Sequence, residues 1–207
     1  DEAGEAIEAA AMHFEESGLG LAESPRFCAV RATFAKEKKE LDRAEAIFEE
    51  CLEDYPINFL VVDEAVKFFD GLGRPERSLE IMRKAYEEAP TFRSYRLSLA
   101  YRLTQAGEDE EAEALLKEAT AVASPALAAS AWADLASYYF GRERLDDAIA
   151  AFEEALARVP DPGPEFFFAY ADALVAAERY DRALELADRM TVKPHRELIR
   201  GRVALAR

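Results

Sequence analysis

Residues 130–160 read SAWADLASYYFGRERLDDAIAAFEEALARVP, and the spacing of their apolar side chains decides the fold. The first half carries apolar residues spaced i, i+3, i+4 and i+7, at Trp132, Leu135, Ala136 and Tyr139. Residues at this spacing share one face of an α-helix. The stretch therefore begins with an amphipathic helix whose apolar stripe combines two aromatic rings with a small residue.

A second helix follows after a turn at residues 142–144. Ala148 and Phe152 lie one turn apart on its apolar face, and Pro160 ends it because proline cannot continue a helix. Since Ala136 and Ala148 are both small, two antiparallel helices can approach closely here, with the aromatic rings filling the space above and below. The stretch predicts a helical hairpin.

The same pattern returns along the chain at a nearly constant interval. The small residue Ala148 has counterparts 34 to 36 residues apart at Ala44, Ser78, Ala112 and Ala183. Pro56 and Pro90 close the first two copies at the offset that Pro160 has in the fourth. The stripe of the first helix repeats less regularly, because Arg31 and Arg96 occupy slots where an apolar residue is expected. A period of this length is typical of stacked helical hairpins.

This pattern resembles the tetratricopeptide repeat family over about residues 25–193. The copy at 130–160 carries nearly every signature residue of the family. The resemblance implies an all-α fold, an α-solenoid or superhelix of about five helix-turn-helix repeats, at residues 25–58, 59–92, 93–128, 129–163 and 164–193. Hairpin turns are expected near residues 39–42, 71–75, 106–109, 141–145 and 177–180. An unrelated helical bundle is the alternative, but it explains the stripes and not the constant phase.

The two ends of the chain are predicted to carry flanking helices. Residues 1–24 contain an amphipathic helix over 3–17, which is either a cap or part of a degenerate repeat. Residues 194–207 form either the first helix of a further repeat or a C-terminal capping helix. Because this last helix is apolar on more than one side, we expect the native chain to continue beyond it.

The charge balance excludes several classes of partner. The chain of 207 residues has 42 acidic and 26 basic residues, for a formal net charge of −16. Such a surface repels nucleic acid and favours a basic or amphipathic protein segment. No stretch approaches the roughly 20 apolar residues that span a bilayer, so membrane insertion is not expected. The composition, rich in alanine and arginine, is typical of a bacterial protein. A cytoplasmic location is slightly favoured, and a periplasmic or exported one stays open because the sequence begins at Asp1 without an initiator methionine.

The sequence offers few residues for catalysis or metal binding. His13 and His195 stand far apart, and neither has a second His or Cys one turn away. No catalytic, cofactor or metal site is therefore predicted, and the protein is not expected to be an enzyme. Cys28 and Cys51 lie on facing core stripes of the first hairpin. We expect them to be close together and reduced, as two small buried residues; a disulfide in an oxidising compartment is the alternative.

The resemblance implies that the first helix of each hairpin lines a concave face, where a peptide or a partner helix can lie. The outward slots of these helices hold the candidate partner-binding residues Arg26, Thr33, Asp63, Lys67, Ser98, Tyr101, Ser137, Phe168 and Asp172. Asp134 is placed on the same outward face. A Lys–Asn clamp for C-terminal carboxylates is not expected, because the single asparagine, Asn58, falls in a loop.

The sequence thus predicts a protein-interaction scaffold without cofactors. The alternative function is a non-catalytic arm of a larger enzyme whose catalytic domain lies outside this chain. Self-association through the convex face or a terminal helix is a further possibility for the partner.

Overall fold

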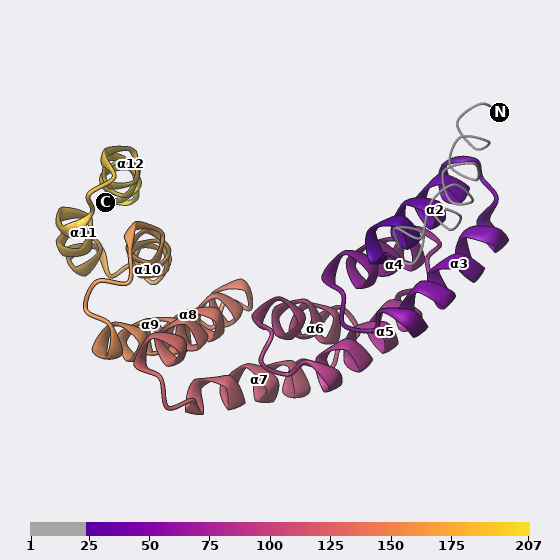
Figure 1. The fold of residues 1–207 in the computed structure, drawn as a ribbon. Helices are drawn as coiled ribbons and strands as arrows, with labels where there is room; N and C mark the ends of the chain where they lie inside the picture. The colour runs from indigo at the N-terminus through magenta and orange to yellow at the C-terminus, as the bar shows by residue number, and fades with distance from the viewer. Residues whose placement is uncertain (1–23) are drawn as a thin grey trace. The chain divides into compact units, whose positions relative to one another are not determined.

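The computed structural model describes residues 24–207, and they form helices with no strand among them (Figure 1). The helices are α2 (Pro25–Glu37), α3 (Leu41–Asp54), α4 (Phe59–Gly71), α5 (Pro75–Glu88), α6 (Arg93–Gln105), α7 (Asp109–Glu118), the short 3₁₀ helix η1 (Ala119–Ala121), α8 (Pro125–Gly141), α9 (Leu145–Arg158), α10 (Pro164–Ala176), α11 (Tyr180–Arg189) and α12 (Lys193–Ala206). The all-α fold of tetratricopeptide-like hairpins is confirmed. The helix expected over residues 3–17 lies outside the described residues.

Two compact units make up the chain. The first ends at Gly107 and contains α2 to α6, and the second begins at Glu108 and contains α7 to α12. We call them unit 1 and unit 2. Helices α2 and α3 pair in unit 1, as do α4 and α5; in unit 2 the pairs are α8 with α9 and α10 with α11.

The five hairpin turns fall at the predicted positions, and each consists of three residues between two helices. The middle residue of every turn has a positive φ, at Lys39, Gly73, Gly107, Glu143 and Glu178. In four of the turns the next backbone N–H donates to a carbonyl five residues earlier, over 2.8 to 3.0 Å: Glu40 to Ala35, Arg74 to Phe69, Arg144 to Tyr139 and Arg179 to Leu174. These bonds satisfy carbonyls that the helix end leaves free, and they set the reversal of the chain.

Small residues lie at the close contacts between paired helices, as the repeat pattern predicts. Ala136 and Ala148 in unit 2 are fully buried. The counterpart of Ala148 on α5 of unit 1 is Ser78, whose hydroxyl donates to the carbonyl oxygen of Val66 at 3.0 Å. This bond satisfies a buried polar group that would otherwise destabilise the core. The Arg158 guanidinium of α9 lies 5.2 Å from the ring centroid of Trp132 on α8, within one hairpin.

Arginine–carboxylate pairs join successive second helices inside each unit. In unit 1, Arg77 of α5 donates to Glu49 of α3 from two nitrogens, with a distance of 3.0 Å from Nε to Oε1. In unit 2, Arg182 of α11 donates to Glu153 of α9 at 2.6 Å. Exposed pairs contribute little stability individually, but the paired geometry of a guanidinium with a carboxylate fixes how neighbouring hairpins stack.

Cys28 and Cys51 correct one prediction. They form a disulfide between α2 and α3, with their Cα atoms 5.8 Å apart. The expected proximity is confirmed, whereas the expectation that both thiols are reduced is wrong. Antiparallel pairing places the start of α2 beside the end of α3, and the resulting Cα separation lies within the range that a disulfide requires.

Candidate functional site

A groove lies between α2 and α4, the first helices of two successive hairpins in unit 1. Its volume is about 400 Å³, and its lining residues are Arg26, Ala29, Val30, Thr33, Phe34, Glu37, Leu60 and Glu64. Val30 and Leu60 are 45% and 41% exposed, although both are large and apolar. An apolar floor that stays open to water on a first-helix face is suited to receive side chains from another molecule.

The local structure of α2 explains why its groove side is open. The helix starts at Ser24, whose hydroxyl accepts a hydrogen bond of 3.2 Å from the Phe27 backbone N–H. The side that packs into unit 1 contains only small residues, namely Cys28, Ala29, Ala32 and Ala35. The larger side chains of Val30 and Phe34 project from other faces of the helix, where they line the groove.

Charged side chains stand at the two ends of the groove. Arg26 belongs to the first turn of α2 and Glu37 to the last, so they are separated by roughly 16 Å along the helix axis. Glu64 of α4 stands on the same rim and accepts a hydrogen bond of 3.1 Å from Lys67. The groove thus has a cationic side chain at one end, a carboxylate at the other and an apolar middle.

Asp63 and Lys67 lie beside this groove on α4. Lys67 Nζ is 2.7 Å from a carboxylate oxygen of Asp63 and 3.1 Å from one of Glu64. The hydrogen bond to Asp63 has the largest effect on Lys67 and raises the pKa of its ammonium group. Both predicted residues are therefore near the candidate site, but in the free protein their charges are already paired with each other.

Ser98 and Tyr101 lie on α6, the next first helix of unit 1. The Tyr101 side chain is 63% exposed, whereas Ser98 is half-buried. Next to Tyr101, Arg102 donates two hydrogen bonds of 2.9 Å to the carboxylate of Asp70 on α4. Burial has the largest effect on Asp70 and by itself raises the pKa of its carboxyl, but the hydrogen bonds and the positive charge of Arg102 oppose it, and the pKa is lowered. This pair holds α6 against α4 and so sets where Tyr101 stands.

The three remaining candidates lie in unit 2. Ser137 is exposed, and its hydroxyl donates to the carbonyl oxygen of Ala133 at 2.9 Å. The Phe168 ring lies against His195, with centroids 4.7 Å apart, and Asp172 pairs with Arg202. Phe168 and Asp172 are thus engaged with α12 inside the unit.

Asp134 corrects a further expectation. Its side chain is 93% buried, since only 7% is exposed, and it does not stand on an outward slot. The nine predicted partner-binding residues divide between the units, and two of them, Arg26 and Thr33, line the groove. The stripe pattern does not predict Val30 or Leu60, because it identifies apolar residues that are buried and these two lie off the stripe.

Comparison with known proteins supports the hairpin architecture. Two models of the tetratricopeptide repeat match the chain, over residues 93–123 and over residues 133–194. These two segments of the chain are tetratricopeptide repeats. No curated protein matches this tetratricopeptide repeat chain in sequence.

Solved structures of several other proteins share the fold. A tetratricopeptide repeat protein from Parabacteroides merdae is 14% identical over 100% of this chain and 87% of its own, with a TM-score of 0.54. PilW, a widely conserved type IV pilus biogenesis factor, is 21% identical over 91% and 92%, with a TM-score of 0.54. YrrB, described as a tetratricopeptide protein with an unusual peptide-binding site, is 16% identical over 95% and 98%, with a TM-score of 0.50. At these identities the likeness shows the fold alone.

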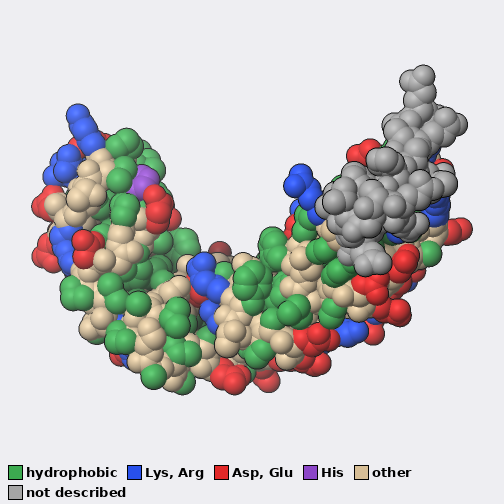
Figure 2. All heavy atoms as spheres, viewed as in Figure 1, with side chains coloured by type: hydrophobic (Ala, Val, Ile, Leu, Met, Phe, Trp, Pro, Cys, Tyr) green, Lys and Arg blue, Asp and Glu red, His purple; other side chains and the backbone are tan. Residues whose placement is uncertain are grey.

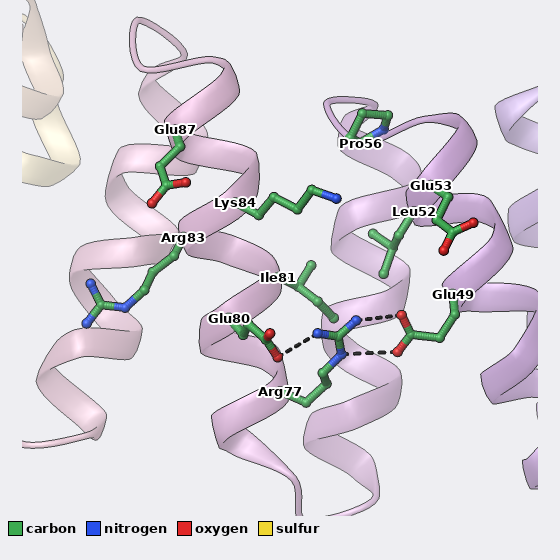
Figure 3. A pocket seen from close by; sticks show the side chains of 10 residues that line it. All are labelled: Glu49, Leu52, Glu53, Pro56, Arg77, Glu80, Ile81, Arg83, Lys84 and Glu87. Carbon is green, nitrogen blue, oxygen red and sulfur yellow. Dashed lines mark hydrogen bonds and ion pairs between the residues drawn. The ribbon is translucent and has the colours of Figure 1, made fainter.

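A second groove of this tetratricopeptide protein lies between α3 and α5, on the second helices of unit 1 (Figure 3). Its volume is about 420 Å³. Leu52, Pro56 and Ile81 give it an apolar lining, and Arg77 crosses it to reach Glu49. Lys84 extends from α5 across the groove toward Pro56. This groove is more strongly charged than the one between α2 and α4.

Within residues 24–207, no group of three or more His, Cys, Asp or Glu side chains is placed to hold a metal ion. None of the described helices has the length and apolar character needed to cross a membrane.

Proposed function

We propose that this tetratricopeptide repeat protein is a protein-interaction scaffold that holds a segment of a partner protein between α2 and α4. The observation that carries this proposal is the open apolar floor of that groove, with Val30 and Leu60 more than 40% exposed. Burying these side chains against a partner would gain the free energy of removing apolar surface from water.

The charges of the groove indicate the chemistry of the segment. Its middle should be apolar, to cover Val30, Phe34 and Leu60. A carboxylate would suit the end at Arg26, and a lysine or arginine the end at Glu37, roughly 16 Å away along α2. Because the net charge of the chain is −16, a basic or amphipathic segment is favoured during the approach of the partner.

The fold is compatible with such a role, but it does not define the site. YrrB has the same type of fold and an unusual peptide-binding site, but at 16% identity to this chain the likeness shows only the fold. The residues of the α2–α4 groove therefore support the proposal on their own.

Site-specific photocrosslinking tests the proposal. A photoreactive amino acid at Thr33, which lines the groove, should form a discrete adduct with a partner in cells of the native source. The matched control is the same substitution at Glu50, an exposed residue on α3 outside the groove. The adduct at Thr33 should disappear in a Val30→Ser, Leu60→Ser background. Adducts that form equally at Glu50, or that survive the double substitution, would show that the partner binds elsewhere.

A further inference from the structure

Three large apolar side chains stand exposed where one hairpin of unit 1 passes to the next. Ile57, Phe59 and Phe92 are 52%, 46% and 42% exposed, and we call them the edge cluster. The Phe59 and Phe92 rings meet edge to face, with centroids 5.9 Å apart. The Tyr95 ring is buried beneath them, with its centroid 4.8 Å from that of Phe92. The Tyr95 hydroxyl donates a hydrogen bond of 2.8 Å to the carbonyl oxygen of Ile57. The two phenylalanine rings therefore form one surface over the buried Tyr95 ring, and Ile57 is linked to it through its backbone carbonyl.

The needs of the fold do not explain this cluster. Phe92 occupies the N-cap of α6, where no side chain caps the helix, although Ser, Thr, Asp or Asn would satisfy a free backbone N–H there. Phe59 is the first residue of α4, and both rings keep more than 40% of their surface in water. A large aromatic residue at a capping position forgoes helix stability, and a contiguous exposed apolar patch is typical of an interaction surface.

Acidic residues directly precede both turns that carry the cluster. The two helices that lead into these turns end in Glu53-Asp54 and in Glu87-Glu88, and neither helix has a basic residue in its last turn. Acidic side chains at a helix C-terminus add to the negative end of the helix dipole, which costs stability. Glu53 and Glu87 line the α3–α5 groove together with Pro56, the residue before Ile57 (Figure 3).

Cations of the protein offset this potential only in part. Arg77 is already paired with Glu49 and Glu80, and Arg93 beside Phe92 is engaged in an interaction of its own. Arg83 and Lys84 are the other cations of the α3–α5 groove, and Arg83 is also engaged in an interaction of its own. Figure 2 shows acidic side chains gathered along α3 and α5 of unit 1. An apolar centre with an excess of carboxylates at its border suits an apolar surface that carries lysines or arginines at its edge.

We propose that the edge cluster docks a basic amphipathic helix of a partner protein. The apolar stripe of that helix would cover Ile57, Phe59 and Phe92, and its basic side chains would reach Glu53 and Glu87. A second copy of this chain is disfavoured, because two copies with a net charge of −16 would bring like-charged borders together. This surface goes beyond the α2–α4 groove of the proposed function and uses none of its lining residues.

The test measures the binding of two synthetic helical peptides by fluorescence anisotropy. One carries leucines at i, i+3, i+4 and i+7 with lysines elsewhere, and the other has glutamate in place of every lysine. The lysine peptide should bind, more weakly as salt rises, and the glutamate peptide should not. Phe59→Ala with Phe92→Ala should weaken binding about tenfold, as expected for loss of an aromatic hot spot. Leu127→Ala, which removes an apolar residue 63% exposed in unit 2, should leave the affinity unchanged.

Charge variants provide a second measurement that does not depend on the aromatic residues. Glu53→Lys with Glu87→Lys should abolish binding of the lysine peptide while the melting temperature holds or rises, because lysine suits a helix C-terminus. Glu110→Lys with Glu118→Lys makes the same change of net charge at exposed sites of unit 2 and should weaken binding far less.

Three results would overturn the inference. The first is that all these variants bind the lysine peptide with equal affinity, or that the lysine and glutamate peptides bind equally well. The second is binding that Val30→Ser with Leu60→Ser abolishes but Phe59→Ala with Phe92→Ala does not, which would support the α2–α4 groove alone. The third is self-association of the free protein that the phenylalanine substitutions remove.

Discussion

Cys28 on α2 and Cys51 on α3 are joined by a disulfide, and this bond ties the helix that lines the α2–α4 groove to its hairpin partner. The packing side of α2 is otherwise formed by alanines, at positions 29, 32 and 35. Alanine buries little apolar area, so this helix gains less from packing than α4, which buries Phe68 and Phe69. The disulfide should therefore contribute a large part of the free energy that holds α2 against the rest of unit 1.

Removing the disulfide should loosen α2. We expect Cys28→Ala with Cys51→Ala to reduce the free energy of unfolding by roughly 3 kcal/mol, the value for a cross-link that closes a loop of about this length. Thermal unfolding with and without a reductant measures the effect. The reductant should lower the melting temperature of the unsubstituted protein and leave that of the variant unchanged. A variant as stable as the unsubstituted protein would show that packing alone suffices for α2.

Glu113 of α7 should give unit 2 a specific sensitivity to acid. Burial has the largest effect on this carboxyl and by itself raises its pKa, but hydrogen bonds from Arg144, Lys117 and Tyr139 outweigh burial and lower the pKa to about 2. A carboxyl whose folded pKa lies below its unfolded value stabilises the fold at neutral pH. That stabilisation is lost as the pH falls from about 4.5 to about 2.

A Glu113→Gln variant separates this contribution from general acid unfolding. Because solvent still reaches the side chain, screening reduces the effect, and we expect a loss of about 1 kcal/mol at pH 7 that vanishes near pH 2. Denaturant unfolding at a series of pH values measures it. Glu110→Gln is the control, since this exposed glutamate neighbours Glu113 on the same helix. Parallel pH curves for the unsubstituted protein and the Glu113 variant would contradict the prediction.

The turn residues with positive φ allow a test of backbone strain without a change in packing. A Cβ atom placed on Gly73 or Gly107 would meet no atom within 4 Å, so alanine there adds conformational strain alone. We expect either Gly→Ala change to destabilise its unit by about 1 kcal/mol. Conversely, Glu143→Gly should stabilise unit 2 by roughly 0.5 kcal/mol, because glycine adopts the φ of 58° at this position readily. Glu143→Ala, which keeps the strain, is the control, and melting temperatures decide.

Much of this architecture follows from the sequence because small residues recur at a regular spacing where paired helices meet. Ala136 and Ala148 are small where two helices meet, and the turns between helices occur at the predicted positions. The redox state of Cys28 and Cys51 does not follow, since spacing predicts only that the two side chains are close. The slot of Asp134 points away from the second helix of its own hairpin and so predicts an outward side chain, yet Asp134 is buried with an interaction of its own.

The candidate site is less predictable than the fold. A search for outward polar residues identifies Arg26 and Thr33 at the groove, but the apolar floor depends on Val30 and Leu60. In sequence, such residues look like ordinary contributors to a core. Only the placement of α4 against α2 shows that they remain exposed. The same holds for Phe92, whose ring could be assigned to the core until its exposure is known.

Phe168 and Asp172, which the sequence predicts to be partner-binding residues, contact α12 in the structure. Two side chains of α12, Ile199 and Val203, are buried, so the contacts of Phe168 with His195 and of Asp172 with Arg202 should matter for its docking. We expect Phe168→Ala to destabilise the docked α12 by about 1–2 kcal/mol, less than for a fully buried ring because Phe168 is half-buried. Hydrogen exchange should show reduced protection in α12 and unchanged protection in α8 and α9. Ser137→Ala, at an exposed slot whose hydroxyl bonds only within its own helix, should leave exchange in α12 unchanged. If Phe168→Ala instead leaves α12 protected and weakens the binding of a partner, the role assigned from the sequence is the correct one, because a ring needed only for docking α12 must alter the stability of that helix.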